Sequence, residues 1–216
     1  MTDEMLEVSR RNAPVVVGRV GYANVEFRKG RIQDLALDLE RLDAELRRAP
    51  IADANAFLRA GELADELRVC HPLVADESVD VVVSNCVLNL VESGEKRRLF
   101  EEIFRVLRKG GRAVISDIVC DEDVPEALQA DPELWSGCIS GALREDAFLR
   151  AFEEAGFYGI RILKRDAGPW RTVHGIEFRS VTVEAFKGKQ GACREFNQAV
   201  IYRGPFREVL DEIGRA

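Results

Sequence analysis

A cysteine follows the end of a predicted buried strand, directly after an asparagine. Residues 79–84 (VDVVVS) form a short apolar run of β-branched residues, which predicts a central strand covered on both faces in a parallel sheet. Asn85 and Cys86 come next, and ligands of open α/β sheets bind at the carboxyl ends of strands. There an amide suits an amino-acid moiety, and a partly exposed thiol can ionise. On these residues alone, a hydrogen-bonded turn with a small buried cysteine is the alternative.

Four further cysteines supply thiols elsewhere: Cys70, Cys120, Cys138 and Cys193. The total is odd and no CxxC pair occurs, so we expect free thiols in a reducing compartment. The two histidines lack the spacing of a histidine-rich metal site. Any site that uses several thiols therefore depends on the fold to bring them together, and Cys138 alone could equally be a helix-packing cysteine beside Trp135.

Composition sets the class of protein. The chain has 216 residues, 46% of them hydrophobic and 32% charged, which predicts one globular domain, with or without an appendage. The net charge of −7 argues against a nucleic-acid or anionic-membrane binder and suits a small-molecule substrate. No apolar run is long enough for a membrane span, and residues 1–12 are charged throughout, unlike a signal peptide. We expect a cytoplasmic protein.

The elements that position Cys86 form a predicted βαβ unit. After the strand at 79–84, apolar residues recur at helical spacing from the N-cap candidate Ser93 to Leu107, and residues 109–111 (KGG) end the helix. A second buried strand follows at 112–117 (RAVISD). The charged run at 95–98 (EKRR) is predicted as the solvated face of this helix. The order of these elements makes the fold α/β.

The rest of the chain supplies flanking elements. The residue patterns predict a helix from Thr2 to about Asn12, a strand at 24–29, a ligand-facing loop at 31–35, two amphipathic helices within 36–68 separated by Pro50, a helix at 145–155, antiparallel strands at 158–164 and 177–186, and a strand at 197–202.

Three sequence blocks resemble S-adenosylmethionine-dependent methyltransferases of the arsenite methyltransferase family. They are residues 81–91 (VVVSNCVLNLV), 104–111 (FRVLRKGG) and 115–117 (ISD). Residues 134–143 (LWSGCISGAL) look like the family's second arsenic-binding segment, and 175–183 (GIEFRSVTV) resemble the last core strand of its bacterial members. The strand–helix–strand blocks would fit many methyltransferases, whereas the pair of cysteine-bearing blocks is specific to this family. The resemblance runs from Met1 to about Pro205.

The resemblance implies a Rossmann-like class I methyltransferase sheet with helices on both faces. It places a partial methyltransferase domain at 1–188, with a helical insertion at 36–70, and a family-type tail at 189–216. The implied activity is methyl transfer from S-adenosylmethionine to As(III), supported by an external thiol reductant. Cys86 and Cys138 would be catalytic by holding the arsenic, with Cys193 as a third ligand. The implied cofactor-binding residues are Met1, Ile32, Gln33, Asp34, Ser84 and Asn85.

The implied chemistry agrees with the residue types. As(III) is soft, so thiolates are its natural ligands, and its lone pair can attack a sulfonium methyl group in line. That step needs no general base, so catalysis would consist mostly of positioning.

The family pattern also predicts a strand, a Gly-rich loop and a helix before the position of Met1, and this sequence contains none of them. In the family the strand order is 3-2-1-4-5-7-6. A chain that lacks strands 1 and 2 would therefore leave two inner sheet edges exposed. We therefore expect a destabilised chain, a homo-oligomer formed through these edges, or the misread start of a longer enzyme. Two other functions stay open: a non-catalytic thiol fragment that binds As(III) or Sb(III), and a small-molecule methyltransferase with structural cysteines.

Overall fold

The computed structural model describes residues 2–188, in two compact units that divide between Ala75 and Asp76. Among the described residues, no helix has the length and apolar character needed to cross a membrane. Met1, Cys193 and the strand predicted at 197–202 lie outside the described residues. The predicted domain boundary at residue 188 therefore stays a prediction.

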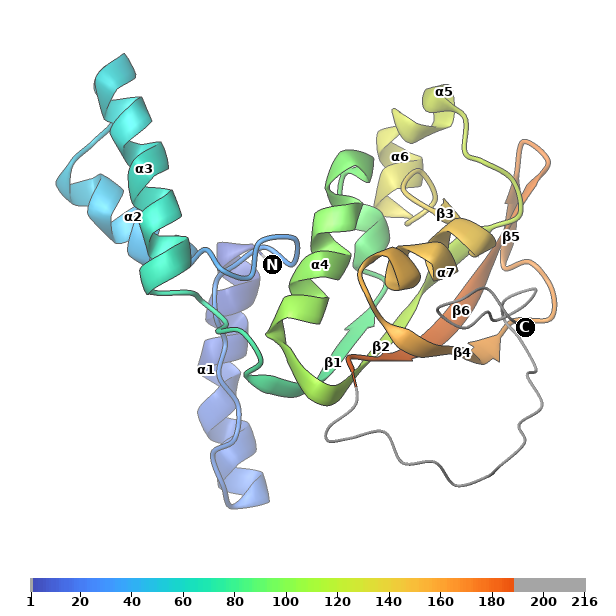
Figure 1. The fold of residues 1–216 in the computed structure, drawn as a ribbon, viewed down its shortest axis with the longest axis horizontal. Helices are drawn as coiled ribbons and strands as arrows, with labels where there is room; N and C mark the ends of the chain where they lie inside the picture. Colours follow the sequence, from blue (N-terminus) through green and yellow to red (C-terminus); the bar gives the residue numbers. More distant parts are fainter. Residues whose placement is uncertain (1, 189–216) are drawn as a thin grey trace, which may run out of the picture. The chain divides into compact units, whose positions relative to one another are not determined.

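The first unit contains three helices, α1 (Asp3–Val20), α2 (Leu39–Arg48) and α3 (Ala54–Cys70) (Figure 1). The side chain of Thr2 caps α1 by accepting a hydrogen bond from the Met5 N–H. The helix is longer than predicted, because it continues through Pro14 to a left-handed glycine cap at Gly21. Helices α2 and α3 confirm the two amphipathic helices predicted within 36–68.

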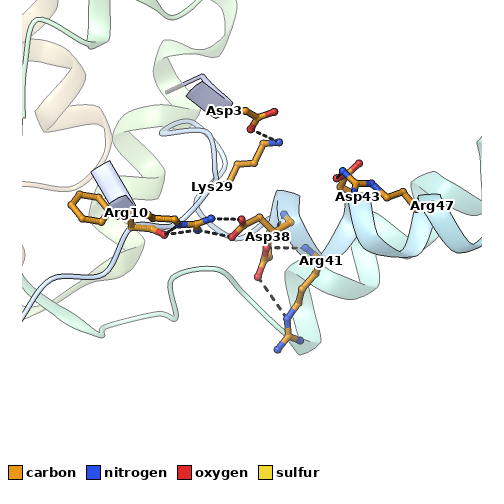
Figure 2. A network of polar contacts seen from close by, with 9 residues as sticks. Asp3, Arg10, Lys29, Asp38, Arg41, Asp43 and Arg47 are labelled. Carbon is orange, nitrogen blue, oxygen red and sulfur yellow. Dashed lines mark hydrogen bonds and ion pairs between the residues drawn. The ribbon is translucent and has the colours of Figure 1, made fainter. Parts of the chain in front are cut away.

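The strand predicted at residues 24–29 is wrong, because this segment is extended but forms no strand in the structure. Its carbonyl groups bind partners within the first unit instead. The Phe27 carbonyl accepts hydrogen bonds from the Arg10 guanidinium (Figure 2), and the Lys29 carbonyl accepts one from the Leu39 N–H. An alternating pattern predicts extended backbone, but a strand also needs a neighbouring strand.

Ion pairs link α1, the extended segment and α2 (Figure 2). The Arg10 guanidinium binds both carboxylate oxygens of Glu40, at 2.6 and 2.8 Å, and Lys29 Nζ lies 2.7 Å from Asp3 Oδ1. These side chains are exposed to solvent, which screens the charges, so each pair contributes little to stability.

The second unit contains a mixed sheet with the strand order β1 (Val79–Asn85), β2 (Leu107–Cys120), β6 (Ile176–Phe186), β4 (Tyr158–Arg165). Strands β1 and β2 are parallel and joined by α4 (Lys96–Val106), which confirms the βαβ unit. Strand β6 runs antiparallel to β2 and β4, which confirms the antiparallel edge. Two short strands complete the sheet: β3 (Leu143–Arg144) pairs with β2, and β5 (Arg171–Val173) pairs with β6.

Helix α4 packs beside α7 (Glu145–Glu154), and both contact β2 (Figure 1). Their contact is aromatic, because the ring of Phe100 meets those of Phe148 and Phe152 edge to face, with centroids 6.2 and 4.8 Å away. Helix α7 confirms the helix predicted at 145–155. The predicted end of α4 is wrong, because residues 109–111 already belong to β2. The α/β class, with a sheet flanked by helices, is confirmed.

Strand β1 lies at the end of the strand order, and among the described residues it pairs only with β2. Its side chains Val81 and Val83 are 45% and 73% exposed. The prediction of a central strand covered on both faces is therefore wrong for the described residues. The apolar run identified the strand correctly, but nothing in the run itself shows which faces neighbouring elements cover.

Candidate functional site

The second unit places Cys86 next to Cys138, although 52 positions separate them in the sequence. The Cys138 thiol donates a hydrogen bond to the Cys86 carbonyl oxygen, with 3.7 Å between sulfur and oxygen. Cys86 is exposed and Cys138 is half-buried, so a small ligand can reach this pair of residues. Both lie beyond the carboxyl end of β1, where ligands of α/β sheets bind.

Cys86 is the first residue after β1, and its backbone turns sharply away from the sheet. Its N–H donates to the Ser116 carbonyl on β2, at 2.9 Å, and its φ of 54° lies in the left-handed region. The thiol lies 3.5 Å from Asn85 Oδ1. A left-handed cysteine is sterically unfavourable, so the surrounding contacts must hold it in place.

Cys138 lies two residues after the short helix α6 (Pro132–Ser136), at the position that glycine usually occupies. Its N–H donates to the Trp135 carbonyl at 3.0 Å, and the next N–H, of Ile139, donates to the Leu134 carbonyl at 2.9 Å. These two bonds are the pattern of a Schellman cap, with Cys138 left-handed at φ 60°. Both members of the cysteine pair thus have a strained backbone, which is common at functional sites.

Two buried charges hold the turn that follows Cys86. The Asp117 carboxylate on β2 accepts hydrogen bonds from the N–H groups of Leu88, at 2.9 Å, and Ile118, at 2.8 Å. Lys96 Nζ donates to the carbonyl oxygen of the same Leu88, at 2.8 Å. The short helical turn Leu88–Leu90 is therefore fixed through both backbone polar groups of its first residue.

Lys96 is only 5% exposed, so the prediction that residues 95–98 form a solvated face is wrong at this position. Helical spacing could have found it, because Lys96 lies three and seven positions before the buried Leu99 and Ile103. Burial lowers the pKa of Lys96 to about 8, although attraction to Asp117 and Cys138 partly opposes this.

Replacement of Lys96 by methionine is expected to remove a rise in stability above pH 8. In the wild type, the folded state releases this proton near pH 8, while the unfolded state holds it to about 10.5. Between these pH values, the free energy of unfolding of the wild type should therefore rise by about 3 kcal/mol more than that of Lys96→Met. Urea denaturation at several pH values measures the difference, and parallel curves for the two proteins would contradict it.

Both thiols of the pair are held in the protonated form. Burial raises the pKa of Cys86 and of Cys138, and the negative charge of Asp117 raises both further. Lys96 opposes this at Cys138. The site therefore suits ligands that react with a protonated thiol and displace its proton, and that do not need a thiolate formed beforehand.

Among the described residues, no group of three or more histidine, cysteine or acidic side chains could hold a metal ion. Cys120 is buried, and burial raises its pKa to about 12, while Cys70 belongs to the first unit. The described part of the site therefore offers two thiols.

The predicted cofactor residues fall in both units. Ser84 and Asn85 end β1 beside the thiols, and the buried Ser84 hydroxyl has no hydrogen-bond partner among the described residues. Such a hydroxyl, next to an exposed amide, fits a polar ligand at this strand end. Ile32, Gln33 and Asp34 belong to the first unit, where the buried Asp34 carboxylate binds the Arg68 guanidinium at 2.9 Å. Their contact with the cofactor stays a prediction.

Comparisons with known proteins find similar methyltransferases. A family model described as a methyltransferase domain matches residues 63–156, and a model described as a domain of unknown function matches residues 189–216. An arsenite methyltransferase of Aquipseudomonas alcaligenes is 32% identical over 212 residues, 94% of this chain and 51% of that protein. One of Halobacterium salinarum is 44% identical over 112 residues, 52% of this chain and 27% of that protein.

A solved structure agrees with these relatives. The arsenic(III) S-adenosylmethionine methyltransferase of Chlamydomonas reinhardtii superposes with a TM-score of 0.61 and 28% identity, over 87% of this chain and 54% of that one. The chain thus spans about half, or less, of the length of these three arsenic methyltransferases.

Proposed function

Because the chain belongs to the arsenite methyltransferase family, we propose that it binds trivalent arsenic and methylates it with S-adenosylmethionine. One observation carries the proposal. The fold brings the cysteines of two distant sequence blocks, Cys86 and Cys138, to the same strand end. Each has a left-handed backbone and lies outside the helices and strands. Thiols are the ligands that a soft centre such as As(III) prefers.

The protonated state of the two thiols suits arsenous acid as the substrate. Each thiol exchanges for one hydroxide on arsenic, and the thiol proton leaves with that hydroxide as water. Two exchanges form two As–S bonds, break two As–O bonds and release two waters, with no net proton. The raised pKa values of Cys86 and Cys138 therefore do not hinder capture.

S-adenosylmethionine, when bound, supplies a sulfonium methyl group whose bond to sulfur breaks with the electron pair left on the sulfur. We assign its contacts in the second unit to Ser84 and Asn85, because a buried hydroxyl without a described partner and an exposed amide lie next to Cys86. We also propose that the cofactor contacts Met1, Ile32, Gln33 and Asp34.

The chain's own residues would act by positioning. Cys86 and Cys138 hold the arsenic so that its lone pair points at the methyl carbon, and formation of the As–C bond converts trivalent to pentavalent arsenic. An external thiol reductant returns the two electrons and is oxidised to a disulfide. Lys96 and Asp117 keep the turn after Cys86 rigid during this step.

Protection from alkylation tests arsenic capture directly. Reduced protein is treated with N-ethylmaleimide, with and without arsenite, and each cysteine is followed by peptide mass spectrometry. The proposal predicts that arsenite slows the modification of Cys86 and Cys138 and leaves the exposed Cys70 unaffected. Equal rates with and without arsenite at the pair would instead make both thiols structural.

Arsenic affinity is expected to be nearly independent of pH. The thiols are neutral below their raised pKa values and arsenous acid is neutral too, so the exchange moves no net proton. Equilibrium dialysis should show less than about a threefold change in affinity between about pH 6 and about pH 8. Metal ions release thiol protons to the solvent when they bind, so their affinity falls as the pH falls. A steep fall of this kind in the arsenic affinity would contradict the proposed exchange.

We also propose that two copies of this chain associate through the outer edge of β1. Among the described residues this edge has no strand partner, and Val81 and Val83 beside it are exposed. Light scattering over a concentration series should give a mass above that of one chain. A single-chain mass at every concentration would rule association out.

We also propose that the protein is cytoplasmic. Cys70, Cys86, Cys120 and Cys138 are free thiols, which suits a reducing compartment.

A further inference from the structure

A buried amide links the turn after Cys86 to the segment that carries Cys138. Asn89 lies three residues beyond Cys86 and is 3% exposed. Its Nδ2 donates to the Ile118 carbonyl on β2 at 2.7 Å, and to the Cys138 carbonyl at 3.2 Å. An amide nitrogen carries two hydrogens, so both donors of Asn89 are used.

The backbone of Asn89 makes a second contact with the same segment. A Cβ atom at Gly141, three residues after Cys138, would lie 2.0 Å from the Asn89 carbonyl oxygen. Only a glycine permits this approach, so side chain and backbone of Asn89 both hold the Cys138 segment close.

Cys86 itself is fixed to β2 by its N–H bond to Ser116, and the turn is fixed by Asp117 and Lys96. The Cys138 segment, in contrast, follows a helix of only five residues, α6. Its position relative to Cys86 depends on the burial of Ile139 in the core and on the contacts that the segment makes with the turn.

We propose that Asn89 is a positioning residue, which sets the separation of the Cys86 and Cys138 thiols by holding the Cys138 carbonyl against the turn. This inference rests on the proposed arsenic capture. A neutral amide changes no charge at the thiols, so its effect is geometric. It should act on a ligand that needs both thiols and spare a reagent that needs only one.

The test uses phenylarsine oxide, a trivalent arsenic compound that binds two thiols together, and N-ethylmaleimide, which modifies one thiol at a time. The full 216-residue chain is compared with Asn89→Ala and Asn89→Ser. The serine variant keeps a polar group in this position, too short to reach both carbonyls, and serves where the alanine variant does not fold. Gln129→Ala is the control, because Gln129 also donates an amide hydrogen to a backbone carbonyl, that of Val124, at 2.7 Å, although its side chain is exposed.

In a folded Asn89 variant, the affinity for phenylarsine oxide should fall by about 10- to 100-fold. The N-ethylmaleimide rates at the two cysteines should stay within about twofold, and Gln129→Ala should bind phenylarsine oxide as the wild type does. Wild-type affinity in a folded Asn89 variant would overturn the inference, as would an equal loss in Gln129→Ala. If wild-type protein fails to bind phenylarsine oxide at Cys86 and Cys138, the proposed function itself fails.

Discussion

Replacement of either Cys86 or Cys138 by serine should lower the affinity for arsenite by at least about 100-fold and abolish methyl transfer. With both thiols present, the second As–S bond forms within the same molecule, at a high effective concentration. A serine hydroxyl is a hard ligand and does not replace the lost bond to a soft centre. Equilibrium dialysis with arsenic detection measures the affinity, and chromatography of methylated arsenic measures the activity.

Cys70→Ser is the matched control for these variants. Cys70 is an exposed free thiol of the first unit, so its loss removes a thiol without touching the pair. Its arsenite affinity should stay within about twofold of the wild type. Unchanged methyl transfer in Cys86→Ser or in Cys138→Ser would eliminate the two-thiol site.

The second large effect is expected for Gly141→Ala. The added methyl group would lie 2.0 Å from a backbone oxygen, that of Asn89, which cannot rotate away as a flexible side chain could. We expect a loss of about 3 kcal/mol in the free energy of unfolding, together with weaker arsenite binding, because the Cys138 segment must move. Urea denaturation and equilibrium dialysis measure the two effects.

Gly137→Ala is the control in the same segment. A Cβ atom there would lie 3.5 Å from its nearest neighbour, the Glu133 carbonyl oxygen, which is an ordinary contact. Its stability should change by less than about 1 kcal/mol. Similar losses for the two variants would show that the close approach at Gly141 is unimportant.

The sequence patterns predict the part of the fold that rests on local periodicity. The βαβ unit of β1, α4 and β2, the helix α7 and the antiparallel strands β4 and β6 are predictable from the spacing of apolar residues along the chain. The patterns do not predict whether an extended segment pairs with a neighbouring strand. Residues 24–29 alternate like a strand, yet side chains such as Arg10 satisfy their carbonyl groups.

The site was predictable to a similar extent. Residue types and the family resemblance identify Cys86 and Cys138, but they do not show what holds the two together. Lys96 lies in a charged run that looks solvated, and Asn89 looks like an ordinary turn residue. Helical spacing can place Lys96 on the buried face of α4, but it does not show that Lys96 binds the Leu88 carbonyl or that Asn89 binds the Cys138 carbonyl.

The most direct test of the account is a methyl-transfer assay with the reduced chain. Isotopically labelled S-adenosylmethionine, arsenite and an excess of a small thiol are incubated with the protein, and chromatography with arsenic detection looks for the label on arsenic. We expect labelled methylarsenic from the wild type and none from Cys138→Ser. Absence of methylated arsenic from a folded sample whose two thiols bind arsenite would contradict it, and would leave a protein that captures the metalloid without methylating it.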